Sequence, residues 1–286
     1  MTDLVWERTP GLAEPVFVTA LAGYFDSASA STGAVDWLID HHGAERIARI
    51  EADDFFDFQQ VRPQVVLDEG VTRRIVWPEN VVHATDRATA GRDLVMLSGI
   101  EPHFRWRQFC SVLVDVARES GCRMVVTLGA TPAQVPHTRM PPVFTSSTDR
   151  ELAARLGLSR PQYQGITGII GVLHAELEHA GLPAIAMRVG VPHYAAGAYN
   201  PKAAMTLLRH LEHVTGVPTS HAELGDAVGE WEQRLDEAVS SDDQARAYLP
   251  QLEAQYDEEA EEQIPSPDDL AEDFQRFLRD AGDDED

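Results

Sequence analysis

Three short segments carry histidine, arginine and lysine side chains that could bind an anion or transfer a proton. In the first, residues 135–139 (VPHTR), His137 and Arg139 lie in a Pro-rich stretch soon after the apolar run at residues 124–128. Histidine acts as an acid or base near neutral pH, and arginine holds phosphate or carboxylate groups. The sequence shows no partner carboxylate for His137, so a histidine hydrogen-bonded to the backbone explains this motif equally well.

The second and third segments also follow apolar runs that we expect to be buried strands. Residues 101–107 (EPHFRWR) place two arginines two positions apart, a spacing that converges on an anion in a loop but diverges on a helix. Residues 191–194 (VPHY) repeat the Pro-His pair, and a lysine follows at the expected start of a helix, whose backbone amides suit an anion. A surface Glu–Arg network and a rigid turn are the structural alternatives. The candidate ligand-binding residues are Glu101, Arg105, Arg107, His137, Arg139, His193, Tyr194 and Lys202.

Motifs of known catalytic chemistry are missing from the sequence. There is no GxSxG, no HExxH and no phosphate-binding glycine loop, since the glycines that precede one expected helix stand at positions 165, 168 and 171. Cys110 and Cys122 lack metal-ligand spacing, and we interpret them as small buried thiols. We therefore assign no catalytic residue and expect no metal site and no cofactor.

The charge balance argues against two classes of partner. The chain has 23 basic and 47 acidic residues, for a net charge of −24 at pH 7. Such a chain repels nucleic acid and anionic membrane surfaces, so we expect neither as a partner. The sequence contains no run of about 18 apolar residues, and its N-terminus lacks a signal-peptide pattern. We predict a cytoplasmic protein.

Apolar runs of strand length alternate with amphipathic helical patterns over much of the chain. From residue 93 to residue 215 strand, loop and helix alternate repeatedly, which favours parallel strands joined by right-handed crossovers. Residues 72–77 and 81–85 are typical of two strands around a Pro-Glu-Asn turn, so we expect an antiparallel hairpin there. We predict a three-layer α/β/α fold with a mostly parallel, mixed sheet. Ligands bind such sheets at the carboxyl ends of strands, where the candidate residues fall.

The C-terminal part of the chain differs from the rest in composition. Residues 251–286 contain 15 acidic residues and 2 arginines, for a net charge of −13. We predict a core domain at residues 1–218 and a helical, strongly acidic extension at residues 219–286. The end of the extension is either a solvated tail or a docking arm, and Phe274 and Phe277 are the candidate contacts of such an arm.

A second candidate interaction segment interleaves acidic and aromatic side chains at residues 53–58 (DDFFDF). Its pattern fits neither the helical nor the strand period. In one interpretation Phe55, Phe56 and Phe58 dock on a neighbouring subunit. In the other, the segment is a loop that folds back over its own core.

Four segments, in their order and spacing, resemble the actinobacterial branch of the proteasome assembly chaperone two family: SGIEPHFRWRQF, VVTLGATPAQVPHTR, YQGITGIIGVL and VPHYAAGAYNPKAAMTLL. The resemblance implies an α/β/α fold of the phosphorylase/hydrolase-like type and a homo-oligomer, with a trimer favoured. It also implies a proteasome-related protein partner, because archaeal and eukaryotic relatives are chaperones for proteasome subunits. Docking tails in the wider family end in a hydrophobic-Tyr-any pattern, whereas this chain ends GDDED.

The sequence supports two hypotheses from different classes of protein. The first is a non-enzymatic, homo-oligomeric assembly chaperone or scaffold protein linked to proteasome assembly. The alternative is a hydrolase- or phosphorylase-like protein that binds a small anion or a nucleoside with the basic loop cluster. Convergence of the basic residues on one open pocket would favour the alternative, whereas side chains engaged in salt bridges would favour the first.

Overall fold

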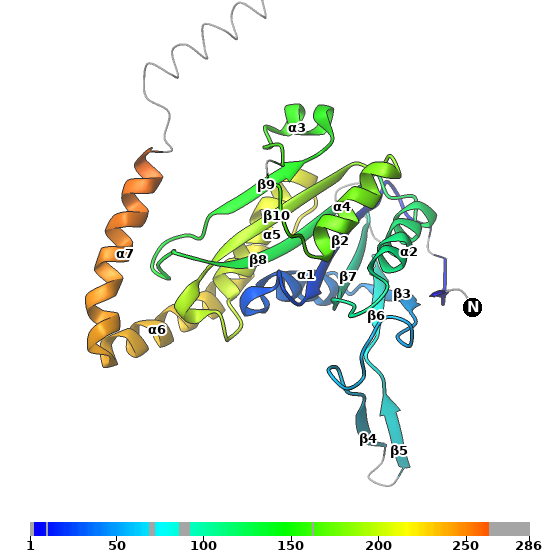
Figure 1. Ribbon diagram of the computed structural model, residues 1–286, viewed down its shortest axis with the longest axis horizontal. Helices are drawn as coiled ribbons and strands as arrows, with labels where there is room; N and C mark the ends of the chain where they lie inside the picture. The colour runs from blue at the N-terminus through cyan, green and yellow to red at the C-terminus, as the bar shows by residue number, and fades with distance from the viewer. Residues whose placement is uncertain (1–2, 10, 69–71, 86–91, 162, 263–286) are drawn as a thin grey trace, which may run out of the picture.

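The computed structural model describes residues 3–9, 11–68, 72–85, 92–161 and 163–262. Among these residues eight strands form one mixed sheet in the order β1-β3-β6-β7-β2-β8-β10-β9, with helices on both faces (Figure 1). The predicted α/β fold with a mixed sheet is therefore confirmed. The strands are β1 (Leu4–Trp6), β2 (Val16–Ala22), β3 (Glu45–Ile50), β6 (Asn80–Ala84), β7 (Leu94–Ile100), β8 (Met124–Ala133), β9 (Val143–Ser147) and β10 (Ala184–Pro192).

The four central strands, β7, β2, β8 and β10, are parallel, and antiparallel strands flank them on both sides. The central strands are almost continuously apolar because helices bury both of their faces, as β2 (VFVTALA) shows. β8 and β10 are in register up to their ends, where Ala133 pairs with Pro192. The two loops that follow these strands therefore start side by side.

Two hydrophobic clusters, one on each face of the sheet, make this a three-layer protein. The first contains side chains of α1 and α5, and the second contains side chains of α2 and α4. The helices are α1 (Ala30–His41), α2 (Trp106–Glu119), α3 (Arg150–Leu156), α4 (Ile169–His179), α5 (Pro201–Thr215), α6 (Gly225–Ser241) and α7 (Asp243–Glu262), with short 3-10 turns η1 (Ser27–Ser29), η2 (His193–Ala195) and η3 (His221–Leu224).

The aromatic segment at residues 53–58 folds back over the protein's own core. Phe55 is fully buried and packs edge-on against Phe109 of α2, with 5.3 Å between the ring centroids. Phe56 is buried as well, so these two residues are core residues and do not form contacts to a neighbouring subunit. Phe58 is half-buried, and its ring lies 4.9 Å from that of Trp77.

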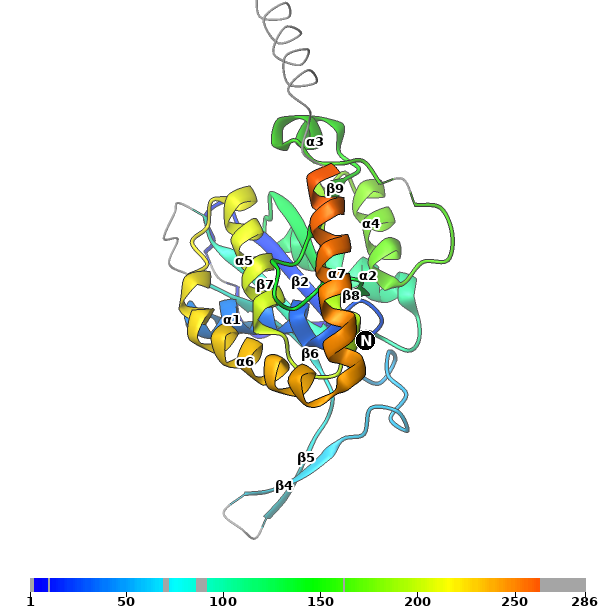
Figure 2. The ribbon, with the colours of Figure 1, turned by 90° about the vertical axis from the view of Figure 1, so that its left-hand side faces the viewer.

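The expected hairpin between residues 72–77 and 81–85 is wrong. β5 (Thr72–Val76) pairs instead with β4 (Gln64–Asp68) in a separate two-stranded sheet that projects from the body (Figures 1 and 2). Asn80 explains the difference, because its buried side chain donates to the Ile100 carbonyl (3.1 Å) and accepts from the Ile100 N–H (2.6 Å). Asn80 is thereby the first residue of β6 in the large sheet, and the Pro-Glu-Asn stretch forms no hairpin turn.

The helices α6 and α7 follow the core and meet at a sharp angle, so that α7 runs past the ends of β8 and β10 (Figure 2). Val228 and Trp231 of α6 and Leu252 of α7 are buried. Phe274 and Phe277 lie outside the described residues. The division into a core at residues 1–218 and an extension at residues 219–286 stays a prediction.

Candidate functional site

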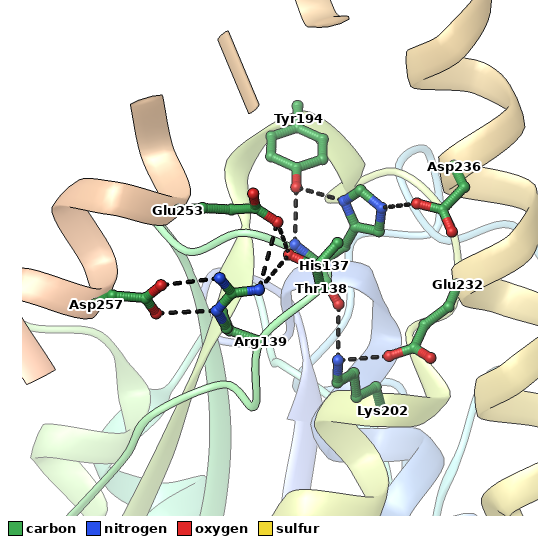
Figure 3. Close-up of polar contacts among 9 residues, drawn as sticks. All are labelled: His137, Thr138, Arg139, Tyr194, Lys202, Glu232, Asp236, Glu253 and Asp257. Atoms are coloured by element: carbon green, nitrogen blue, oxygen red, sulfur yellow. Dashed lines mark hydrogen bonds and ion pairs between the residues drawn. The ribbon is translucent and has the colours of Figure 1, made fainter. Parts of the chain in front are cut away.

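The loops that follow β8 and β10 meet, and the start of α5 lies beside them (Figure 3). The His137 N–H donates a hydrogen bond of 2.8 Å to the Tyr194 hydroxyl, which joins the first loop to the second. Asn200 caps α5 by accepting from the Ala203 N–H (2.9 Å), and Pro201 occupies the first turn, where no backbone donor is lost. This cap places Lys202 next to the first loop.

The His137 imidazole is buried and uses both of its ring nitrogens. Nδ1 lies 2.8 Å from the Tyr194 hydroxyl, and Nε2 lies 3.0 Å from Oδ1 of Asp236 on α6. A carboxylate can only accept, so we assign a proton to Nε2. Trp231 packs edge-on against the ring, with 6.3 Å between centroids. The histidine therefore connects the loop to α6 and offers no free nitrogen to a ligand.

Lys202, the chain's only lysine, is 5% exposed and connects the same loop to α6. Its ammonium donates to the His137 carbonyl (2.7 Å) and to Oε1 of Glu232 (2.5 Å). A buried ammonium must be paired and hydrogen-bonded to be tolerated, and these two oxygens meet that need. Figure 3 shows Lys202 below the loop and Glu232 reaching it from α6.

Arg139 connects the loop to α7. Its Nε and Nη2 donate to the two oxygens of Asp257, at 2.9 and 2.8 Å, in the bidentate geometry that arginine forms with carboxylates. Nη1 lies 3.4 Å from Glu253, which also accepts from the Thr138 hydroxyl. The hydrogen bonds with Asp257 raise the pKa of Arg139, and those from Arg139 hold the pKa of Asp257 below its usual range.

Four acidic side chains contact this group of loop and α5 residues, two of them from α6 and two from α7. Glu232 and Asp236 on α6, and Glu253 and Asp257 on α7, are each four residues apart and so lie on one face of their helix. We call these four residues the acidic clamp. The clamp was not predicted from the sequence, although the four-residue spacing of the acids within each helix was a signal that could have revealed it.

His193 and Tyr194 complete the cluster. His193 Nδ1 lies 3.2 Å from the Ala133 carbonyl, and Tyr248 of α7 packs edge-on against its ring, with 5.9 Å between centroids. Burial raises the pKa of Tyr194. The structure thus brings together five of the eight predicted ligand-binding residues: His137, Arg139, His193, Tyr194 and Lys202.

The other three predicted residues form separate contacts. Glu101 accepts from the Tyr24 N–H (3.0 Å) in the loop after β2. Arg105 stands just before α2 and forms an ion pair of 3.2 Å with Asp54, while Arg107 is exposed on α2. The predicted convergence of these residues with the loop after β8 is therefore not observed.

The positive charges of Arg139 and Lys202 are paired with carboxylates of the acidic clamp, and these ion pairs connect the region around the loop after β8 to α6 and α7. Lys202 is buried behind its pair with Glu232, and an external anion would compete with Glu253 and Asp257 for the Arg139 guanidinium. Among the described residues, no group of three or more His, Cys, Asp or Glu side chains is placed to hold a metal ion. Cys110 and Cys122 are buried, as predicted, and burial raises the pKa of each thiol to about 12, which makes both poor nucleophiles.

These features define the class: a three-layer α/β protein whose C-terminal acidic helices close on a basic loop at the end of the sheet. None of the described helices is both long enough and apolar enough to cross a bilayer. The family model described as "PAC2 family" matches residues 20–239. The chain belongs to the PAC2 family.

Solved structures show what the chain is similar to. A PAC2 family protein from Streptomyces avermitilis is 39% identical, with a TM-score of 0.74 over 78% of this chain and 95% of the other. A proteasome-assembly chaperone homologue from Mycobacterium tuberculosis is 35% identical, with a TM-score of 0.74 over 82% of this chain and 99% of the other. A second M. tuberculosis protein, of unknown function, is 27% identical, with a TM-score of 0.81 over 92% and 91%. No curated protein matches the chain.

Proposed function

We propose that this protein is a non-enzymatic, homo-oligomeric scaffold or assembly-chaperone-like protein that acts on a proteasome-related partner. Family membership and the 35% identity to a protein named as a proteasome-assembly chaperone homologue support the partner class. The acidic clamp supports a non-enzymatic role, because the loop residues most suited to acid–base chemistry are engaged in holding α6 and α7.

The observation that carries the proposal is the projecting β4–β5 arm, which we define as residues 64–68 and 72–77. Val65, Leu67 and Trp77 are 59%, 55% and 50% exposed, and Val66, Ile75 and Val76 are exposed as well. An isolated two-stranded hairpin is marginally stable in water, and a contiguous exposed apolar surface marks an interaction site. We expect the arm to pack against a second copy of the chain.

The charge of the arm supports a second copy of this strongly acidic chain as its first contact. Arg73 and Arg74 are adjacent on β5, Asp68 is the one acidic residue among the described residues of the arm, and the chain as a whole carries a net charge of −24. A basic, apolar arm is therefore complementary to the acidic surface of another subunit. The resemblance to homo-oligomeric relatives favours a trimer.

The first experiment is light scattering of the full-length protein at micromolar concentration. We expect a mass that is a multiple of the 31.5-kDa chain, with three copies favoured. The double variant V65R/I75E replaces a directly paired cross-strand couple with an opposite-charge couple, so the hairpin keeps its pairing while two exposed apolar side chains become charged. The matched control V65I/I75V keeps the apolar face.

We expect V65R/I75E to shift the mass toward the monomer and V65I/I75V to retain the oligomer. A monomeric wild type, or an unchanged mass in V65R/I75E, would refute the role of the arm. The partner class is tested separately by native mass spectrometry with purified proteasome α- and β-subunits of the same host. A complex of defined stoichiometry is expected, and its absence for both subunits would refute the link to the proteasome.

A further inference from the structure

A cavity of about 710 Å³ lies on the sheet face that α2 and α4 cover, and no residue of the acidic clamp lines it. Its floor consists of residues of β8 and β10, including Thr127, Gly129 and Arg188. Its walls are the loop that follows β2 and the first turn of α4. The volume is within the range of small-molecule sites, and the position at the carboxyl half of parallel strands is where α/β proteins bind ligands.

Small residues keep this space open. Gly129 and Ala186 line the cavity, where longer side chains would fill it. A Cβ added to Gly129 would find its nearest neighbour, the Phe25 carbonyl oxygen, at an ordinary 3.5 Å. The backbone around Gly129 is therefore not packed so closely that it demands glycine.

The lining combines apolar and aromatic side chains with the hydroxyl side chains of Ser27, Thr131 and Thr167. Tyr24, Tyr163 and Ile166 stand at the rim, each at least three-quarters exposed. Arg188 is the one charged side chain among the lining residues that the structure describes. Its guanidinium packs over the ring of Phe144, 5.8 Å from the centroid, and it has no ion pair among the described residues.

The sign of this charge is informative because the protein is strongly acidic. In a chain with twice as many acidic as basic residues, a cavity whose lining includes one exposed arginine and no carboxylate is complementary to an anion. Thr131 adds a hydroxyl group to the floor, whereas the Thr127 hydroxyl is engaged with His174 Nε2, 2.8 Å away. We infer that the cavity is a binding site for a small organic carboxylate with a flat apolar body, whose carboxylate pairs with Arg188.

This site differs from the cluster that the sequence suggested, and it is independent of the proposed scaffold role. His137, Arg139 and Lys202 are engaged by the clamp, whereas Arg188 was not among the predicted residues. The apolar body would lie against the aromatic rim and Ile170 of α4, and its burial would supply affinity without any reaction.

The test is a calorimetric titration of the full-length protein with naphthalene-2-carboxylate and its neutral analogue naphthalene-2-carboxamide. We expect one site per chain for the carboxylate and binding at least about tenfold weaker for the amide, since a charge-assisted bidentate pair is lost. The variant R188Q should weaken carboxylate binding by a similar factor and leave amide binding unchanged. The matched control R107Q, an exposed arginine on α2, should behave as the wild type.

A steric variant, G129V, places a branched side chain in the cavity and should abolish binding of both probes while the circular dichroism stays that of the wild type. No saturable binding at millimolar probe, equal affinity for the two probes, or equal effects of R188Q and R107Q would each overturn the inference. These three outcomes remain decisive if G129V fails to fold. If instead a segment of a second copy occupies the cavity, G129V will change the mass of the oligomer and the carboxylate will not bind, which also overturns the inference.

Discussion

The ion pair between Lys202 and Glu232 gives the sharpest test of how the C-terminal helices are held. Lys202 is 5% exposed, and its ammonium has two oxygen partners in the described structure, the Glu232 carboxylate at 2.5 Å and the His137 carbonyl at 2.7 Å. The variant E232Q keeps the shape of the side chain but removes its charge. The buried Lys202 ammonium then has only uncharged hydrogen-bond acceptors.

The expected cost follows from the burial of the two partners. Removing one partner of a fully buried ion pair costs about 3–5 kcal/mol. The Glu232 side chain is 36% exposed, and Lys202 keeps the His137 carbonyl, so we expect E232Q to lower the free energy of unfolding by about 2–3 kcal/mol. K202M removes the buried charge itself and leaves one carbonyl without its donor, at a cost of about 1–2 kcal/mol.

Adding E232Q to K202M should therefore cost almost nothing more, and the double-mutant cycle should show a coupling of more than about 1 kcal/mol. The assay is urea unfolding of the full-length protein, followed by tryptophan fluorescence and circular dichroism. The control is E230Q, whose side chain is 75% exposed and forms only a 3.8 Å pair with Arg234. We expect that change to cost less than about 0.5 kcal/mol. An E232Q cost no larger than that of E230Q would refute the reasoning.

Two further predictions concern titratable groups in the core. Burial lowers the pKa of His174 from 6.5 to about 4, so between these values the unfolded chain binds a proton that the folded protein excludes. Stability should therefore fall as the pH drops from about 6.5 to about 4, and H174Q should flatten that part of the stability curve; an unchanged slope would rule out His174 as its source. The thiols of Cys110 and Cys122, with pKa values of about 12, should not react with Ellman's reagent at pH 8 until the protein is unfolded, and rapid labelling of the native protein would contradict their burial.

Local sequence pattern predicted much of the sheet. The apolar runs in β2, β7, β8 and β10 are strands in the structure, because a run of strand length that is apolar on both faces is typical of a strand buried in the middle of a sheet. The pattern misled at residues 72–85, where two strand-like runs flank a turn-like tripeptide. Pairing there depends on Asn80 and the backbone of Ile100, 20 residues away, which no local rule can detect.

The candidate site was predicted in part. The meeting of the loops after β8 and β10 was expected, since both follow strands that can be parallel neighbours. The acidic partners of those loops were not predicted, because Asp236 lies 99 residues from His137 in the chain and Asp257 lies 118 residues from Arg139. The sequence of an acidic helix is equally consistent with a solvated surface helix and with a helix that pairs with basic residues. Which of the two forms depends on the angle at which the helix packs against the rest of the protein.

By itself the sequence determined the central strands and their alternation with helices, the strongly negative charge and the residue types of each loop, because these depend on the residues of a single segment. Tertiary structure alone decided that Phe55 and Phe56 are core residues, that the β4–β5 arm projects, and that the basic loop is closed by acidic helices. It also decided that a cavity containing Arg188 opens where Gly129 and Ala186 leave space. Each of these outcomes depends on segments that are distant in the chain packing against one another, and the period of side chains along a single segment carries no information on that packing.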